Sequence, residues 1–107
     1  MKYRVVILPS AEEQIDSYIN YIACTRREPI NARKVLVKIR QSVDRIELFP
    51  NAAPYAPEND HRPYVIRMTV VAGCRLLFTV DEDTKTVRVI GFRHNRQMPD
   101  SGQLPDQ

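Results

Sequence analysis

The first part of the chain has one strand-like run followed by hydrophobic positions at helical spacing. Residues 3–8 are rich in β-branched side chains and end at Pro9, which predicts a strand buried on at least one face. Ser10 and Glu13 then have the spacing of a capping box, so we expect a helix with Ser10 as its N-cap. Its apolar positions share one helical face: Ala11, Ile15, Tyr18, Ile19 and Ile22. We expect this helix to end near Cys24.

A second helix is predicted after Pro29, because the first helical turn does not need the amide hydrogen that proline lacks. The apolar side chains of this helix cluster on one face: Ala32, Val35, Leu36, Ile39, Val43 and Ile46. Four polar side chains fall on the opposite face: Lys34, Lys38, Gln41 and Arg45. The short connection predicts an antiparallel helical hairpin, and its apolar face needs a third surface to cover it.

The second half of the chain carries turn signals and strand-like runs. Residues 50–63 contain four of the eight prolines and no periodicity, which predicts a loop that can include one short turn. Strand-like runs follow at residues 64–70, 74–80 and 86–93, and the short turns between them predict an antiparallel meander. In the middle run, one face carries Leu76, Phe78 and Val80 and the other carries Arg75, Leu77 and Thr79. In the last run, Val87 and Val89 oppose Arg88 and Ile90.

These elements predict an α+β domain with the order β-α-α-β-β-β, in which a helical hairpin packs on a largely antiparallel four-stranded sheet. The length of 107 residues, with 43% hydrophobic and 27% charged residues, is typical of one globular domain. No apolar run is long enough to span a bilayer, so we expect a cytoplasmic protein without a membrane partner.

The net charge of +3 is unevenly distributed. Residues 26–45 carry seven basic and two acidic side chains, and residues 62–97 carry seven basic and three acidic ones. The remainder of the chain is acidic. This asymmetry predicts an acidic partner, either a nucleic acid or an acidic polypeptide.

The inventory of glycine, serine, cysteine and histidine excludes several common kinds of site. The three glycines form no phosphate-binding loop, and no serine has the setting of a nucleophile elbow. Cys24 and Cys74 lack metal-binding spacing, and His61 and His94 are too few for a metal site of their own. We therefore expect two reduced thiols, no metal and no cofactor.

A set of cations in and after the predicted strands remains as the candidate for function: Arg67, Arg75, Arg88, Arg93, His94 and Arg96. The residues alone leave two interpretations open. His94 with Arg75 and Arg93 could bind a phosphate and move a proton during RNA cleavage. Alternatively, the arginines are solvated or paired with nearby carboxylates.

Several segments resemble, in order and spacing, the ParE/RelE toxin superfamily. They are Pro9–Glu12 at the entrance to the first helix, IELFP at residues 46–50, RLLF at residues 75–78 and VIGFRHNRQ at residues 89–97. The resemblance covers residues 2–98 and is closer to the ParE branch, whose members end the last strand with a histidine followed by basic residues. It implies a single toxin domain over residues 1–98 and a flexible tail over residues 99–107.

The resemblance further implies the toxin of a type II toxin-antitoxin, or plasmid stabilisation, system. A ParE-like toxin inhibits DNA gyrase without catalysing a reaction and is neutralised by a cognate acidic antitoxin of the ParD kind. The target-binding residues that we predict on this basis are Arg67, Arg75, Arg93, His94, Arg96, Gln97 and Met98.

The alternative is a RelE/YoeB-like, metal-independent endonuclease that cleaves messenger RNA on the ribosome. Arg75 falls where that branch has a phosphate-binding arginine, and His94 matches a histidine of YoeB-like members; Arg93 would be a second phosphate contact. Those members follow the histidine with a terminal tyrosine, whereas Asn95 stands here. A neutral amide cannot supply the stacking and proton transfer of a phenol, which favours the gyrase interpretation. A third possibility is a non-toxic homologue retained for binding its partner.

Overall fold

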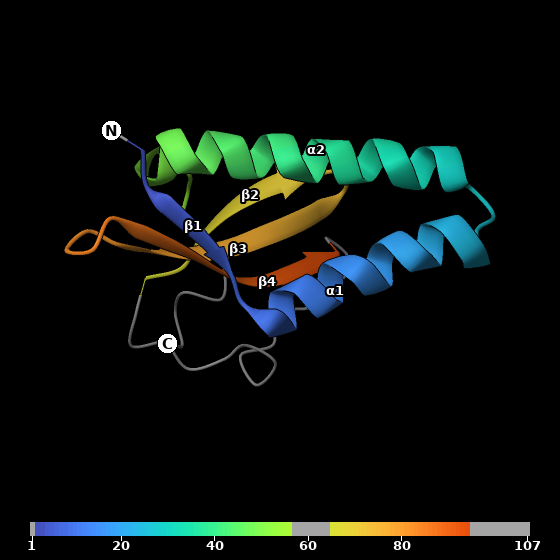
Figure 1. Ribbon diagram of the computed structural model, residues 1–107, viewed down its shortest axis with the longest axis horizontal. Coiled ribbons are helices and arrows are strands. Elements are labelled where there is room, and N and C mark those ends of the chain that lie inside the picture. Colours follow the sequence, from blue (N-terminus) through green and yellow to red (C-terminus); the bar gives the residue numbers. More distant parts are fainter. Residues whose placement is uncertain (1, 57–64, 95–107) are drawn as a thin grey trace.

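The computed structural model describes residues 2–56 and 65–94, and places a helical hairpin against one face of a four-stranded sheet (Figure 1). The elements are β1 (Arg4–Ile7), α1 (Pro9–Asn20), a π-helical segment (Tyr21–Thr25), α2 (Pro29–Leu48), a 3-10 turn (Pro50–Ala52), β2 (Arg67–Val71), β3 (Cys74–Asp81) and β4 (Thr86–His94). The predicted element order and the α+β class are confirmed. Residues 99–107, the predicted tail, lie outside the described residues.

The strand order in the sheet is β1-β4-β3-β2. Strands β2, β3 and β4 form the predicted antiparallel meander, whereas β1 pairs in parallel with the first half of β4, so the sheet is mixed. Because β1 is an edge strand, only Val5 packs against the core, and Val6 and Ile7 are each 37% exposed. The predicted burial of this strand is therefore limited to one side chain.

The main core lies between the helical hairpin and the sheet. The helices contribute the predicted apolar faces, which include Ala11, Ile15, Ile22, Ala32, Val35, Ile39 and Ile46. The sheet contributes side chains that include Leu76, Phe78, Val87 and Val89. A smaller cluster on the opposite face of the sheet contains Ala56, Ile66, Leu77 and Ile90. The predicted division of β3 into a face with Leu76 and a face with Leu77 is thus confirmed.

The start of α1 differs from the capping-box prediction. Leu8 is the N-cap in an extended conformation, Pro9 occupies the first turn, and no side chain caps the helix. Proline is favoured in this position because its fixed backbone angle suits a helix start. The predicted N-cap role of Ser10 is therefore wrong. The helical path continues through the π-helical segment to Thr25, close to the predicted end, and α2 begins at Pro29 as predicted.

Strand β2 begins later than predicted, because Val65 and Ile66 precede it outside the regular strand. Ile66 is nevertheless fully buried in the smaller cluster. The described part of the preceding loop, residues 50–56, contains the short turn Pro50–Ala52, and Tyr55 makes an isolated antiparallel bridge to Arg67. In the part of the chain that the structure describes, no helix combines the length and the apolar character that crossing a bilayer requires.

Candidate target-binding site

An extra residue in β4 decides where the predicted site residues point. Phe78 pairs with Val89, but the preceding Leu77 pairs with Gly91, so Ile90 is inserted in β4 as a β-bulge. Side chains alternate between the faces of a strand, and an extra residue reverses the alternation beyond it. Phe92 accordingly joins the main core, on the same face as Val89.

The bulge brings Arg93 directly opposite Arg75 in the sheet. Arg75 lies between Cys74 and Leu76, which both belong to the main core, so its side chain is on the face of the sheet that points away from the helices. Cross-strand partners share a face, and Arg93 therefore lies on this outer face as well. The two residues are only 6% and 3% exposed.

A buried pair of arginines is an unusual feature, because the removal of charge from water is unfavourable without compensating interactions. Neither Arg75 nor Arg93 is without an interaction partner. Burial also limits the number of conformations that each side chain can adopt. The outer face of β3 and β4 thus holds two guanidinium groups that expose little surface to solvent and already have interaction partners.

His94 lies on the other side of the sheet, beside α1. The ring centroid of Tyr18 is 6.0 Å from that of His94 and 5.7 Å from that of Phe92. Cys74, the cross-strand partner of His94, is fully buried. Burial raises the pKa of the Cys74 thiol, so the thiol stays protonated at neutral pH and is a poor nucleophile.

A groove of ≈ 490 Å³ runs between α1 and the end of β4. Its lining residues are Ser10, Glu13, Gln14, Ser17, Tyr18, Phe92, Arg93 and His94. The Phe92 amide donates a hydrogen bond of 2.8 Å to Gln14 Oε1, and this bond satisfies a backbone group of β4 beyond the last pair with β1. The groove therefore places a phenol and a carboxylate in the neighbourhood of His94.

Arg67 is separated from the Arg75–Arg93 pair. It pairs with Phe78 in the sheet, three residues along β3 from Arg75. Its Nη1 donates a hydrogen bond of 2.6 Å to the Ala53 carbonyl, and its guanidinium carbon lies 4.7 Å from the centroid of the Tyr55 ring. These contacts hold the segment after the 3-10 turn against β2.

The seven predicted target-binding residues are thus not one cluster. The structure brings Arg75 and Arg93 together, places His94 on the opposite face of β4 and Arg67 at the start of β2. Arg96, Gln97 and Met98 lie outside the described residues. Within residues 2–56 and 65–94, no group of three or more His, Cys, Asp or Glu side chains is placed to hold a metal ion.

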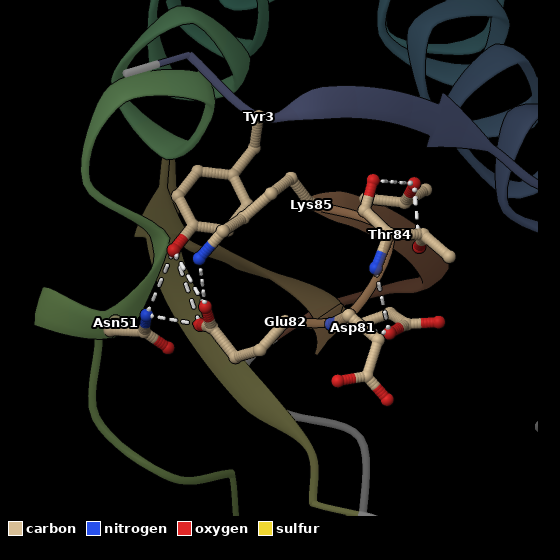
Figure 2. Close-up of polar contacts among 8 residues, drawn as sticks. Tyr3, Asn51, Asp81, Glu82, Thr84 and Lys85 are labelled. Atoms are coloured by element: carbon tan, nitrogen blue, oxygen red, sulfur yellow. Dashed lines mark hydrogen bonds and ion pairs between the residues drawn. The ribbon is translucent and has the colours of Figure 1, made fainter.

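A separate polar cluster joins the start of the chain to the turn between β3 and β4 (Figure 2). Glu82 accepts hydrogen bonds from the Tyr3 hydroxyl at 3.0 Å, from Asn51 Nδ2 at 2.6 Å and from Lys85 Nζ at 2.8 Å. The bond from Lys85, followed by those from Asn51 and Tyr3, lowers the pKa of Glu82 from 4.5 to about 2. This cluster connects three segments by mutually satisfied groups, so its role is structural.

The lowered pKa of Glu82 predicts a specific loss of stability in acid. A carboxylate whose pKa is lowered by folding stabilises the protein above its unfolded pKa, and the contribution is lost as the pH falls from about 5 to about 2. We expect Glu82→Gln to lower the melting temperature at neutral pH and to differ less from the wild type at the acid end. Melting followed by circular dichroism across this range checks the prediction. Asp16→Asn, at an exposed position of α1, is the control. If the melting temperatures of the wild type and Glu82→Gln differ by the same amount at every pH, the prediction is contradicted.

The sequence matches the family model described as "ParE toxin of type II toxin-antitoxin system, parDE" over residues 5–99. The chain belongs to the ParE toxin family. Among solved structures, it is similar to a chain described as "Chromosomal ParDE TA system from P. aeruginosa", with a TM-score of 0.66 and 16% identity over 87% of this chain and 96% of that chain. At this identity the likeness shows the fold. No curated protein matched the sequence. Membership of the superfamily and of its ParE branch is thereby confirmed.

The candidate residues predicted from the sequence lie in and after the strands. The prediction did not include α1, although side chains of this helix line the groove beside His94. Ser10 and Glu13 were assigned to a cap and Tyr18 to the core, yet all three line the groove beside His94. Helical periodicity does not predict that Tyr18 is also partly exposed, because a residue at the edge of an apolar face contacts both the core and solvent.

Proposed function

We propose that this ParE-family toxin inhibits DNA gyrase by binding to it, and that a cognate acidic antitoxin of the ParD kind neutralises the toxin. The family match over residues 5–99 is the observation that carries the proposal. Gyrase acts in the cytoplasm, and we place the toxin in the same compartment. The proposed contact surface is the outer face of β3 and β4 at Arg75 and Arg93, continued by the residues Arg96, Gln97 and Met98 that follow in the sequence.

The geometry of β4 supports binding rather than catalysis. Cleavage of RNA through its 2′-hydroxyl needs an acid and a base within hydrogen-bonding reach of the phosphate that the cations hold. The bulge at Ile90 directs Arg93 to the outer face and His94 to the helix side. Arg75 and Arg93 therefore lie on the opposite face of the sheet from His94, although Arg93 and His94 both line the groove beside α1.

A supercoiling assay tests the proposal. Purified toxin, added to gyrase and relaxed plasmid, should block the formation of supercoiled DNA, and prior mixing with the antitoxin should restore it. The antitoxin to be tested is the protein encoded by the reading frame next to the toxin gene. The absence of inhibition at a large molar excess of folded toxin would count decisively against the proposal.

The messenger RNA endonuclease is the second candidate, and one observation favours it. Asn95 stands where nuclease members carry a tyrosine, but α1 places the Tyr18 ring 6.0 Å from the His94 ring, so a phenol is available from another element. Primer extension on messenger RNA from expressing cells discriminates the two functions. We expect no cuts at the ribosomal A site; cuts that disappear in both His94→Ala and Arg75→Ala would establish the nuclease instead.

A further inference from the structure

The solvent side of α2 carries a line of side chains that the fold does not use. These residues, which we call the α2 outer stripe, are Ile30, Arg33, Lys34, Val37, Lys38 and Gln41. Their spacing of three and four residues places them in one line along the helix, opposite the face that packs in the core. All six are exposed, and together they line a shallow groove of ≈ 470 Å³.

Two apolar side chains in this stripe have no role in the core. Ile30 is 73% exposed and Val37 is 48% exposed. They are seven residues apart, which corresponds to two helical turns and a separation of about 10.5 Å on the same side of α2. Exposed apolar side chains at this spacing are typical of the anchor positions at which one helix receives another.

The charged residues of the stripe have one sign, and the neighbouring Glu28, which lies beside Ile30 and Lys34, pairs with Arg26. Arg33, Lys34 and Lys38 are positive, and the stripe contains no acidic residue. Among the described residues, the ion pairs nearest in sequence are Arg26–Glu28 before the stripe and Lys2–Glu47 after it, and neither involves a residue of the stripe. Charge complementarity therefore selects an acidic partner, and the attraction also accelerates its association.

The mixture of apolar and basic residues distinguishes between two acidic partners. A nucleic acid backbone would pair with Arg33, Lys34 and Lys38, but it would leave Ile30 and Val37 without apolar contacts. An amphipathic helix with acidic flanks satisfies both sets at once, because its apolar line covers the anchors while its carboxylates meet the cations. The observations therefore favour a protein helix.

We propose that the α2 outer stripe docks an acidic amphipathic helix of the cognate antitoxin. This inference rests on the proposed function, because it takes the antitoxin as the source of the helix. The stripe lies opposite the core-packing face of α2, whereas Arg75 and Arg93 lie on the face of the sheet that points away from the helices. The docked helix consequently anchors the antitoxin, and another antitoxin segment must cover the target-binding face.

Calorimetric titration of the full-length toxin with the purified antitoxin tests this surface. Lys34→Glu combined with Lys38→Glu should raise the Kd at least tenfold, because two attractive contacts become repulsive. Ile30→Ala combined with Val37→Ala should raise the Kd by roughly tenfold, because the anchors lose their apolar contact. Both variants change exposed positions of a long helix, so the melting temperature should stay close to that of the wild type.

The matched charge control is Lys2→Glu combined with Arg4→Glu. This control changes the net charge by the same amount as the charge-reversed stripe variant, at exposed positions near the other end of α2. Its Kd for the antitoxin should stay within about twofold of the wild-type value. Phe49→Ala is the control for the apolar pair, since Phe49 is 64% exposed just beyond the end of α2 and outside the stripe. Weaker binding by both stripe variants and unchanged binding by both controls is the supporting result.

The remaining outcomes separate the two proposals. If the wild-type toxin does not bind the antitoxin, the proposed pairing fails, and this inference fails with it. If the wild type and both stripe variants bind with equal Kd, the pairing stands and the docking surface is overturned. If the charge-reversed variant keeps the antitoxin but loses affinity for a short DNA duplex that the wild type binds, the stripe is a nucleic acid surface and the inference is overturned as well.

Discussion

Replacement of Phe78 by alanine should lower the free energy of unfolding by about 3–5 kcal/mol, the usual cost of removing a buried aromatic ring. Phe78 is 0% exposed and is the largest of the fully buried side chains. It lies in β3, between β2 and β4, and belongs to the main core beneath the helices. No other strand or helix can move easily into the space that the ring leaves, because Phe78 is paired on both sides.

Urea unfolding followed by far-ultraviolet circular dichroism measures this loss. Phe49→Ala is the matched control, because Phe49 is 64% exposed just after α2, and its removal should change the free energy by no more than about 0.5 kcal/mol. A small domain has a total stability of about 5–15 kcal/mol, so the Phe78 variant should be close to unfolding. Equal effects of the two substitutions would contradict the placement of Phe78 at the centre of the core.

The second large effect concerns the buried arginines of the outer sheet face. Arg75→Met combined with Arg93→Met should raise the toxin concentration needed to inhibit gyrase by about 100-fold, since arginines that a partner contacts are frequent hot spots worth about 2 kcal/mol or more. Methionine keeps most of the side-chain volume. Each arginine has an interaction partner that the substitution leaves behind, so the melting temperature of the variant is measured beside its inhibition.

The control for this variant is Arg88→Met. Arg88 lies on the same strand and the same face before the bulge, is more exposed, and is 3.8 Å from Asp81 through its Nη1. We expect its inhibitory concentration to change by less than about threefold, because an exposed ion pair contributes little. Inhibition by the Arg75 and Arg93 variant at the wild-type concentration, with an unchanged melting temperature, would remove the outer face from the target-binding surface.

Much of the fold was predictable because the information is local. The apolar faces of α1 and α2 repeat at helical spacing, and Pro29 marks the start of the second helix in the sequence as in the structure. The alternation of Leu76, Leu77 and Phe78 assigned their faces correctly. Each of these features depends on the periodicity of one element and on turn residues beside it, which a single sequence contains.

The features that escaped prediction depend on contacts between elements. Whether Pro9 or Ser10 opens α1 is decided by how β1 leads into the helix, because Leu8 donates its amide to Val89 before the first turn. The bulge at Ile90 is a property of the pairing between β3 and β4, and its one local signal is the adjacent Gly91, since a glycine inside a strand often marks a bulge. Strict alternation along β4 would put Arg93 on the helix side and His94 on the outer face, which is the reverse of their positions in the structure.

The candidate site was therefore predictable in its residue types and only partly in its geometry. Arg75 and Arg93 were identified as cations of adjacent strands, and the structure brings them into direct register. His94 was grouped with them but contacts Tyr18 on the helix side. Because helix and strand are distant in sequence, that contact follows from tertiary packing and not from a local pattern.

The most direct measurement of the proposed function is the stoichiometry of gyrase inhibition. A toxin that binds and does not catalyse should inhibit in proportion to the toxin bound. The supercoiling rate should fall as toxin is titrated into a fixed amount of gyrase and reach its minimum when the binding sites are filled. It should recover when antitoxin is added. Gyrase that stays fully active at saturating toxin would contradict the proposal. So would activity that continues to decline with time at a small fraction of one toxin per gyrase, because only a catalyst acts in that way.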